Sequence, residues 1–204
     1  MTKTISRLYN NQIDARAAVK ELEAAGVSHG DISILVSNAD GSYDEKTKTF
    51  PDRDLDGKDD RAEGAATGGS VGAVAGGAAG ALAGLGIMAI PGVGPVVAAG
   101  WLVATLAGAA TGGAAGGIIG ALSQQAGISS GEADVYAEGL RRGGALVSAR
   151  VADEDAVRYQ AIMDRSAVRI QDRAAAYRKT GWTKYDQAAL PYNRDQVIKE
   201  RSLY

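Results

Sequence analysis

Residues 64–84 read GAATGGSVGAVAGGAAGALAG, with glycine at every fourth position. A second glycine row follows the turn IPGVGP at 90–95 and consists of Gly100, Gly108, Gly112, Gly116 and Gly120. Because residues four apart lie on one face of an α-helix, each row predicts a helix with one side of bare backbone. The pattern therefore predicts a helical hairpin, residues 64–88 and 96–123, whose glycine faces permit unusually close helix packing.

This hairpin needs support from outside itself. Each interior glycine disfavours a helix by about 1 kcal/mol relative to alanine, so the glycines of the first row would leave an isolated helix unstable in water. No charged residue occurs between Glu63 and Glu132, so either close protein partners or lipid must supply that support. The residues expected to form the packing and oligomerisation surface are Gly68, Gly72, Gly76, Gly80, Gly108, Gly112, Gly116 and Gly120.

Two environments for the hairpin remain open. Either predicted helix is long enough to cross a hydrocarbon core of about 30 Å. The basic residues in the flanks, among them Arg61 and Arg141, would keep both ends cytoplasmic. The first helix has only five large aliphatic residues, which makes it a weak membrane inserter. The hairpin is therefore expected either to associate with a membrane or to be buried only in protein.

The flanks of the hairpin predict a small α+β domain. Alternation and caps predict the order strand, helix, strand before the hairpin and helix, strand, helix, strand after it. Two such halves assemble most simply as a ferredoxin-like split βαβ sandwich, with the helices on one face and the glycine-rich hairpin as an insertion. The predicted strands are 4–9, 31–37, 145–151 and 167–170, and the predicted helices are 11–25, 130–140 and 153–165.

The predicted organisation has five parts. The two halves of the domain are 1–37 and 124–172, and the hairpin is 64–123. An acidic linker occupies 38–63, and a basic, aromatic C-terminal arm occupies 173–204. The aromatic residues of the arm are expected to pin it onto the domain; they are Trp182, Tyr185 and Tyr192.

The acidic linker contains a candidate calcium loop. Residues 52–63 match the pattern D-x-D-x-D-G-x5-E, in which side-chain oxygens and one carbonyl surround Ca²⁺. Asp59 replaces the usual aliphatic anchor and Pro51 leaves no entering helix, so a solvated acidic linker is the alternative. The predicted ligands are Asp52, Asp54, Asp56, the Lys58 carbonyl, Asp60 and Glu63.

Several function classes lack support in the sequence. The net charge of −2 gives no basic field for nucleic acid, and the third predicted strand has no aromatics for stacking on RNA bases. The chain has no cysteine and one histidine, His29, in a loop where it is expected to face solvent. No phosphate loop or dinucleotide fingerprint occurs. We therefore expect a non-enzymatic protein that requires no cofactor other than the possible Ca²⁺, located in the cytoplasm or at the cytoplasmic face of the inner membrane.

Residues 131–151, GEADVYAEGLRRGGALVSARV, resemble the bacterial heat-induced general stress protein family, and 175–192 resemble the arm of its longer members. The most specific element is Y-x-E-G-x-R-R-G-G at 136–144. The resemblance implies a small, stress-associated, non-enzymatic protein and supplies no catalytic residues.

Two functions follow from these patterns. The first is a general-stress scaffold that forms homo-oligomers through the glycine hairpin and associates with a membrane. The alternative is a soluble module that binds a small ligand or Ca²⁺, in which the hairpin is purely structural.

Overall fold

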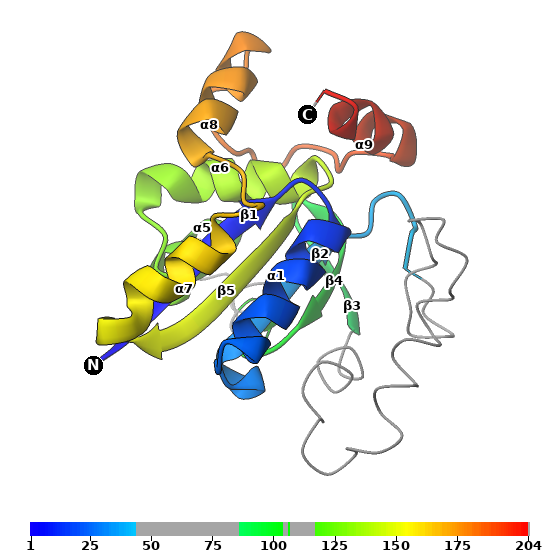
Figure 1. Ribbon diagram of the computed structural model, residues 1–204. Helices are drawn as coiled ribbons and strands as arrows, with labels where there is room; N and C mark the ends of the chain where they lie inside the picture. The colour runs from blue at the N-terminus through cyan, green and yellow to red at the C-terminus, as the bar shows by residue number, and fades with distance from the viewer. Residues whose placement is uncertain (44–85, 104–105, 107–116, 204) are drawn as a thin grey trace.

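The computed structural model describes residues 1–43, 86–103, 106 and 117–203. Within these ranges, five strands form one antiparallel sheet in the order β1-β5-β2-β4-β3, and helices cover both of its faces (Figure 1). The chain is therefore of the mixed α/β class.

The first half of the domain forms as the sequence predicts. β1 (Thr2–Tyr9) leads into α1 (Gln12–Ala24), and β2 (Ile32–Ser37) follows a short 3-10 turn. Asn11 caps α1, because its side chain accepts a 2.9 Å bond from the Asp14 amide. Gly26 ends the helix with a φ of +104°, a conformation that favours glycine.

The second half places its first strand between the two strands of the first half. β5 (Ala145–Ala152) pairs antiparallel with β1 on one side and with β2 on the other. It lies between α6 (Ser130–Arg141) and α7 (Ala156–Met163) in the sequence, and both helices were predicted. β1, β5 and β2 therefore form the split βαβ core of the sheet.

The structure corrects the predicted helical hairpin at residues 86–99. They form two strands, β3 (Gly86–Ile90) and β4 (Gly94–Ala99), of which β4 pairs with β2 and extends the sheet. The Val93 amide bonds to the Ile90 carbonyl at 3.0 Å across Pro91-Gly92, so the predicted turn joins strands and not helices. β-branched and apolar residues on both sides of a Pro-Gly turn favour strands, and the fourfold glycine spacing is interrupted here, between Gly84 and Gly100.

The last predicted strand, 167–170, is also corrected. Val168 lies beside β1 and donates one 2.7 Å bond to the Leu8 carbonyl, but the chain then turns into α8 (Ile170–Lys179). In place of the fourth strand of a ferredoxin-like sheet, the chain therefore makes a single backbone hydrogen bond to β1. The helices lie on two faces and not on one, which is a further departure from that fold.

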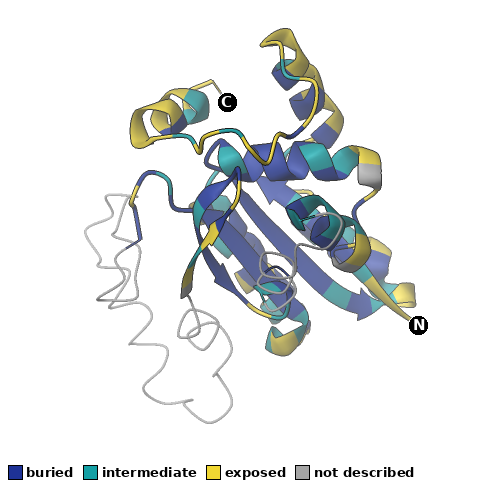
Figure 2. Ribbon diagram, turned by 180° about the vertical axis from the view of Figure 1, so that it is seen from behind, coloured by how far each residue is buried: buried dark blue, intermediate teal, exposed yellow. Residues whose placement is uncertain are grey.

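Each face of the sheet has its own core. Side chains such as Ile34 and Val147 pack with α1 and α7, whereas Leu35 and Leu146 pack on the other face with α6 and α5 (Gly117–Gln125). β2 and β5, in the middle of the sheet, are almost wholly buried (Figure 2). The C-terminal arm adds α8 and α9 (Arg194–Arg201) at one end of the sheet.

Candidate functional site

The richest cluster of charged and aromatic side chains surrounds the Y-x-E-G-x-R-R-G-G element. Its centre is Glu138 on α6, whose side chain is completely buried. Arg142, one helical turn later, donates from Nε to Glu138 at 2.6 Å, and Arg141 Nη1 donates at 3.2 Å. A buried carboxylate is stable only when it is paired and hydrogen-bonded, and both arginines meet that need. We call Glu138, Arg141 and Arg142, together with their arm partners Tyr177, Tyr192, Glu200 and Arg201, the arm cluster.

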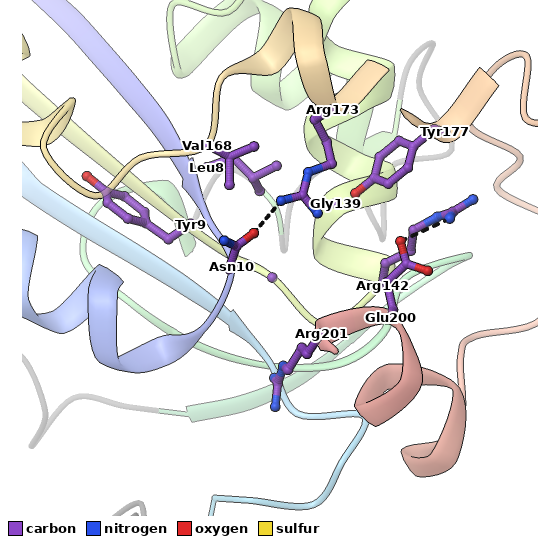
Figure 3. A pocket seen from close by; sticks show the side chains of 11 residues that line it. Leu8, Tyr9, Asn10, Gly139, Arg142, Val168, Arg173, Tyr177, Glu200 and Arg201 are labelled. Carbon is purple, nitrogen blue, oxygen red and sulfur yellow. Dashed lines mark hydrogen bonds and ion pairs between the residues drawn. The ribbon is translucent and has the colours of Figure 1, made fainter. Parts of the chain in front are cut away.

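Arg142 joins α6 to the C-terminal arm. Its Nη1 donates to Glu200 of α9 at 3.1 Å, and its guanidinium lies 4.2 Å from the ring centroid of Tyr177 on α8 (Figure 3). Burial disfavours the charged form, but the bond to Glu138 and the charges of Glu138 and Glu200 outweigh it and raise the pKa of Arg142 above its ordinary value. One arginine thus holds both arm helices.

Gly143, just after α6, provides the surface on which α9 lies. Gly143 has a φ of +99°, and a Cβ there would overlap Cγ1 of Val197 on α9. Its carbonyl accepts bonds from Arg201 Nε at 3.1 Å and Nη2 at 2.7 Å. Arg201 also donates to Asp40, just after β2, at 2.6 Å. α9 is therefore fixed to the ends of two strands.

Tyr185 and Tyr192 of the arm hold it to the domain, as the sequence predicts, whereas the ring contact of Trp182 is with Tyr177 inside the arm. Tyr185 is buried, and its hydroxyl donates to the Pro91 carbonyl in the β3–β4 turn at 2.5 Å. Trp182 packs edge-on against Tyr177, with ring centroids 5.7 Å apart. Tyr192 lies under the Arg141 guanidinium at 4.9 Å. The arm thus also contacts the root of the glycine-rich region.

The arm cluster leaves little room for a ligand. The cavity among Asn10, Arg173 and their neighbours measures about 10 Å³, close to the space that one water molecule occupies. Arg173 donates to Asn10 in its wall (Figure 3). Since the buried charged groups of the described ranges bond to other groups of the chain, the geometry indicates a structural clamp. These groups are Asp40, Glu138, Arg142 and Arg173.

Most of the predicted packing surface lies outside the described residues. Of its eight glycines only Gly120 is described, and it is half-buried on α5. Gly100 directly follows β4 with a φ of +91°, and a Cβ there would overlap the Ile32 carbonyl, so the helix prediction is wrong at this residue. Leu102, Leu106 and Ile118, predicted on the second helix, are buried in the core shared with α6.

The other predicted sites have separate outcomes. All six predicted calcium ligands lie outside the described residues, and inside them no three His, Asp or Glu side chains gather as a metal site requires. Nδ1 of His29 lies 2.9 Å from Glu23, with the histidine side chain about one third exposed. Among the helices of the described ranges, none is long and apolar enough to cross a bilayer.

The arm cluster was not predicted as a site. Its readable signal is the spacing of Glu138 and Arg142, because charges four apart on a helix meet. The partners on α9 lie about 60 residues further along the chain, and nothing local in the sequence indicates them.

Comparison with known proteins gives no match: no family model, no curated protein and no solved structure is similar to this chain.

Proposed function

We propose that this chain is a non-enzymatic scaffold, in which the α/β domain presents the glycine-rich region and copies of the chain associate through it. One observation carries the proposal: the described parts of the uncharged region are built into the domain. Between the two glycine rows β3 and β4 belong to the sheet, and after the second row Ile118 and Leu122 of α5 are buried against α6. The second glycine row is thus flanked on both sides by elements of the folded domain.

The use of buried charge supports a scaffold role. Glu138 and Arg142 fasten the arm, and Asp40 receives Arg201. These are the groups that a catalytic site would need free and directed into a cavity, and here they bond to one another instead. The cluster therefore supports a structural purpose for the most distinctive element of the sequence.

The described apolar residues of the uncharged region favour protein over lipid as their surroundings. Leu102, Leu106 and Ile118 contribute to the domain's own core, which reduces the apolar surface left for a membrane. We therefore propose protein-to-protein packing along the glycine rows as the primary interaction, and attachment to a membrane as a secondary one.

Two substitutions test the self-association. Gly76→Leu and Gly112→Leu each place a large side chain on a predicted glycine face, and we expect both to reduce the assembly to smaller species by native mass spectrometry. Gly30→Leu is the matched control, because its Cβ would meet no atom within 4 Å. Near-ultraviolet circular dichroism checks that the domain stays folded. Assemblies of wild-type size from both variants would refute the proposal.

Cell fractionation tests the membrane part separately. We expect most of the protein in the supernatant of a high-speed spin, with a minor pellet fraction that detergent releases. If instead most of the protein is found in the pellet, stays there in high salt and is released only by detergent, then lipid, and not protein, is the main partner of the glycine rows.

The proposed stress context rests on the resemblance alone. It predicts that the abundance of the chain rises after a heat shift of its native cells, measured by quantitative immunoblot against a constant reference protein.

A further inference from the structure

β3 forms one edge of the sheet, and among the described residues no strand lies on its outer side (Figure 1). The Asn38 amide bonds to the Pro95 carbonyl at 2.8 Å, so Pro95 directs its main chain toward β2. Because bonding directions alternate in an antiparallel ladder, Ala89, the β3 partner of Pro95, directs its amide and carbonyl away from β4. Ile87, two residues earlier, does the same.

These outward main-chain groups are open. Ile87 is 39 % exposed, and Ala89 is also exposed. Within the described ranges, no hydrogen bond outside the β3–β4 ladder involves the backbone of either residue. A strand added beside β3 can therefore form four main-chain bonds, one to the amide and one to the carbonyl of each residue.

β3 lacks the features that protect an edge strand from pairing, which include charged side chains, proline and a covering segment. β1, the opposite edge, carries Lys3 and Arg7, and the Val168 amide bonds to its Leu8 carbonyl at 2.7 Å. β3 reads Gly-Ile-Met-Ala-Ile and contains neither a charge nor a proline. The two edges therefore differ, and β3 is the one open to pairing.

The occupant that fits this edge is a second copy of β3. Two-fold pairing centred on Met88 places Ile87 of each copy opposite Ala89 of the other, and each of these two pairs exchanges two bonds. All the outward groups of both residues are then bonded. An uncharged strand brings no like charges together when it pairs with itself, whereas a charged partner would gain no ion pair from it.

We propose that β3 pairs antiparallel with β3 of a second copy, so that one sheet continues across two chains. The pairing covers the exposed Ile87 side chain of each copy as well as its main chain. Since the contact is short, we expect a dissociation constant of about 100 µM. This contact is separate from the proposed packing of the glycine rows, and either can form without the other.

A disulfide tests both the pairing and its register, because the chain has no cysteine of its own. Directly opposed residues of a pair without hydrogen bonds have Cα atoms about 4.5 Å apart, within the range of a disulfide. Met88→Cys should therefore form a linked dimer under mild oxidation at about 100 µM protein, measured on a non-reducing gel. Ile87→Cys is the matched control. It is more exposed than Met88, but its two copies lie about 8 Å apart in this register and should link at least about tenfold more slowly.

The same experiment in the Gly76→Leu, Gly112→Leu background separates the two contacts between copies. We expect Met88→Cys to link there as fast as in the chain with both glycines. Loss of the link in that background would overturn edge pairing as a separate contact and leave the glycine-row proposal standing. Equal rates for Met88→Cys and Ile87→Cys in either background would overturn the register and the proposal with it.

A proline at position 89 removes an outward amide and leaves the inner ladder intact. The Ala89 amide points away from β4, so Ala89→Pro costs no β3–β4 bond. Added to Met88→Cys, it should slow linking at least about tenfold, with the near-ultraviolet circular dichroism unchanged. Ala89→Val keeps the amide and should link at the parent rate. Equal linking in the proline and valine variants would refute main-chain pairing.

Hydrogen exchange on the wild-type chain tests the edge without a substitution. Exchange of the Ile87 and Ala89 amides should slow as the protein concentration rises from about 5 to about 500 µM, while amides of β1 stay constant. Full protection of both amides at the lowest concentration, together with no Met88→Cys link, would mean that another part of the same chain covers the edge. That result would overturn the proposal.

Discussion

Glu138 and Arg142 form a buried ion pair, 2.6 Å from carboxylate to Nε, at the point where α6, the sheet and the C-terminal arm meet. The two residues are one helical turn apart, so the helix itself sets their geometry. Arg142 continues to Glu200, which makes the pair the link between the domain and α9.

Removal of the carboxylate charge should be costly. Glu138→Gln leaves Arg142 buried with a weaker partner, and we expect the free energy of unfolding to fall by about 3 kcal/mol in urea titrations. The control is Glu21→Gln, whose partner Arg165 is mostly exposed, and it should cost less than about 1 kcal/mol. Equal losses in the two variants would contradict a central role for the buried pair.

A methyl group at Gly143 should displace α9. Gly143→Ala combines a strained positive φ with overlap of Val197, so we expect a loss of about 2 kcal/mol and faster cleavage of the arm by trypsin. Gly131→Ala, at the exposed start of α6 with no atom near its Cβ, should be neutral or slightly stabilising. An arm that resists trypsin as well in Gly143→Ala as in wild type would show that α9 tolerates the shift.

Asp40 should make stability depend on pH in the acid range. Burial raises the pKa of its carboxyl, but the charge of Arg201 and bonds from Ser42 and Arg201 outweigh burial, so the pKa lies below its ordinary value. A lowered folded-state pKa stabilises the protein above the unfolded-state pKa, and this contribution disappears as the pH falls through the folded-state pKa. Asp40→Asn should therefore be less stable than wild type near pH 6, and the difference should narrow from about pH 5 toward pH 2. Urea midpoints across this range measure it, and a constant difference would exclude the carboxylate as its cause.

Calcium binding remains a prediction from the sequence. If residues 52–63 form the loop that their pattern indicates, calorimetry should record Ca²⁺ binding to the wild-type chain and none to an Asp54→Ala, Asp56→Ala double variant. Mg²⁺ is the control ion, since its smaller, octahedral shell suits this ligand set poorly. A wild-type chain that gives no heat would remove the calcium hypothesis.

Local sequence signals predicted those elements whose ends are marked by capping residues or whose residues alternate between apolar and polar. Asn11 before α1, Gly26 after it and the alternation in β1 are readable within a few residues, and the structure confirms them. At 86–99 the fourfold glycine spacing is interrupted, between Gly84 and Gly100, and the apolar runs around Pro91-Gly92 favour a hairpin of strands. The predicted helices extended past the glycine rows into this stretch. The pairing of β4 with β2 fixes it as part of the sheet, and the sequence does not indicate that pairing.

The arm cluster shows the same limit at longer range. The spacing of Glu138 and Arg142 is readable, and so is the capping box of Asn193 and Gln196 that begins α9. The contact between α6 and α9 is not readable from the sequence, because Glu200 bonds to Arg142 across 58 positions of chain. The strand predicted at 167–170 is wrong for a related reason. Its β-branched residues suit a strand, but the chain leaves β1 after Val168 to start α8.

The pairing of β1 with β5 has a consequence for how the chain folds. The hydroxyls of Ser6 and Ser148 meet at 2.8 Å although 142 positions separate them. Completion of the sheet therefore waits until β5 leaves the ribosome, long after β1, α1 and β2 have been made. The entropy of closing so long a loop grows only logarithmically, by about 0.6 kcal/mol per doubling of length. Evolution can thus lengthen or shorten the stretch between β2 and β3 at little cost to equilibrium stability. The folding rate is what the long separation between β1 and β5 lowers.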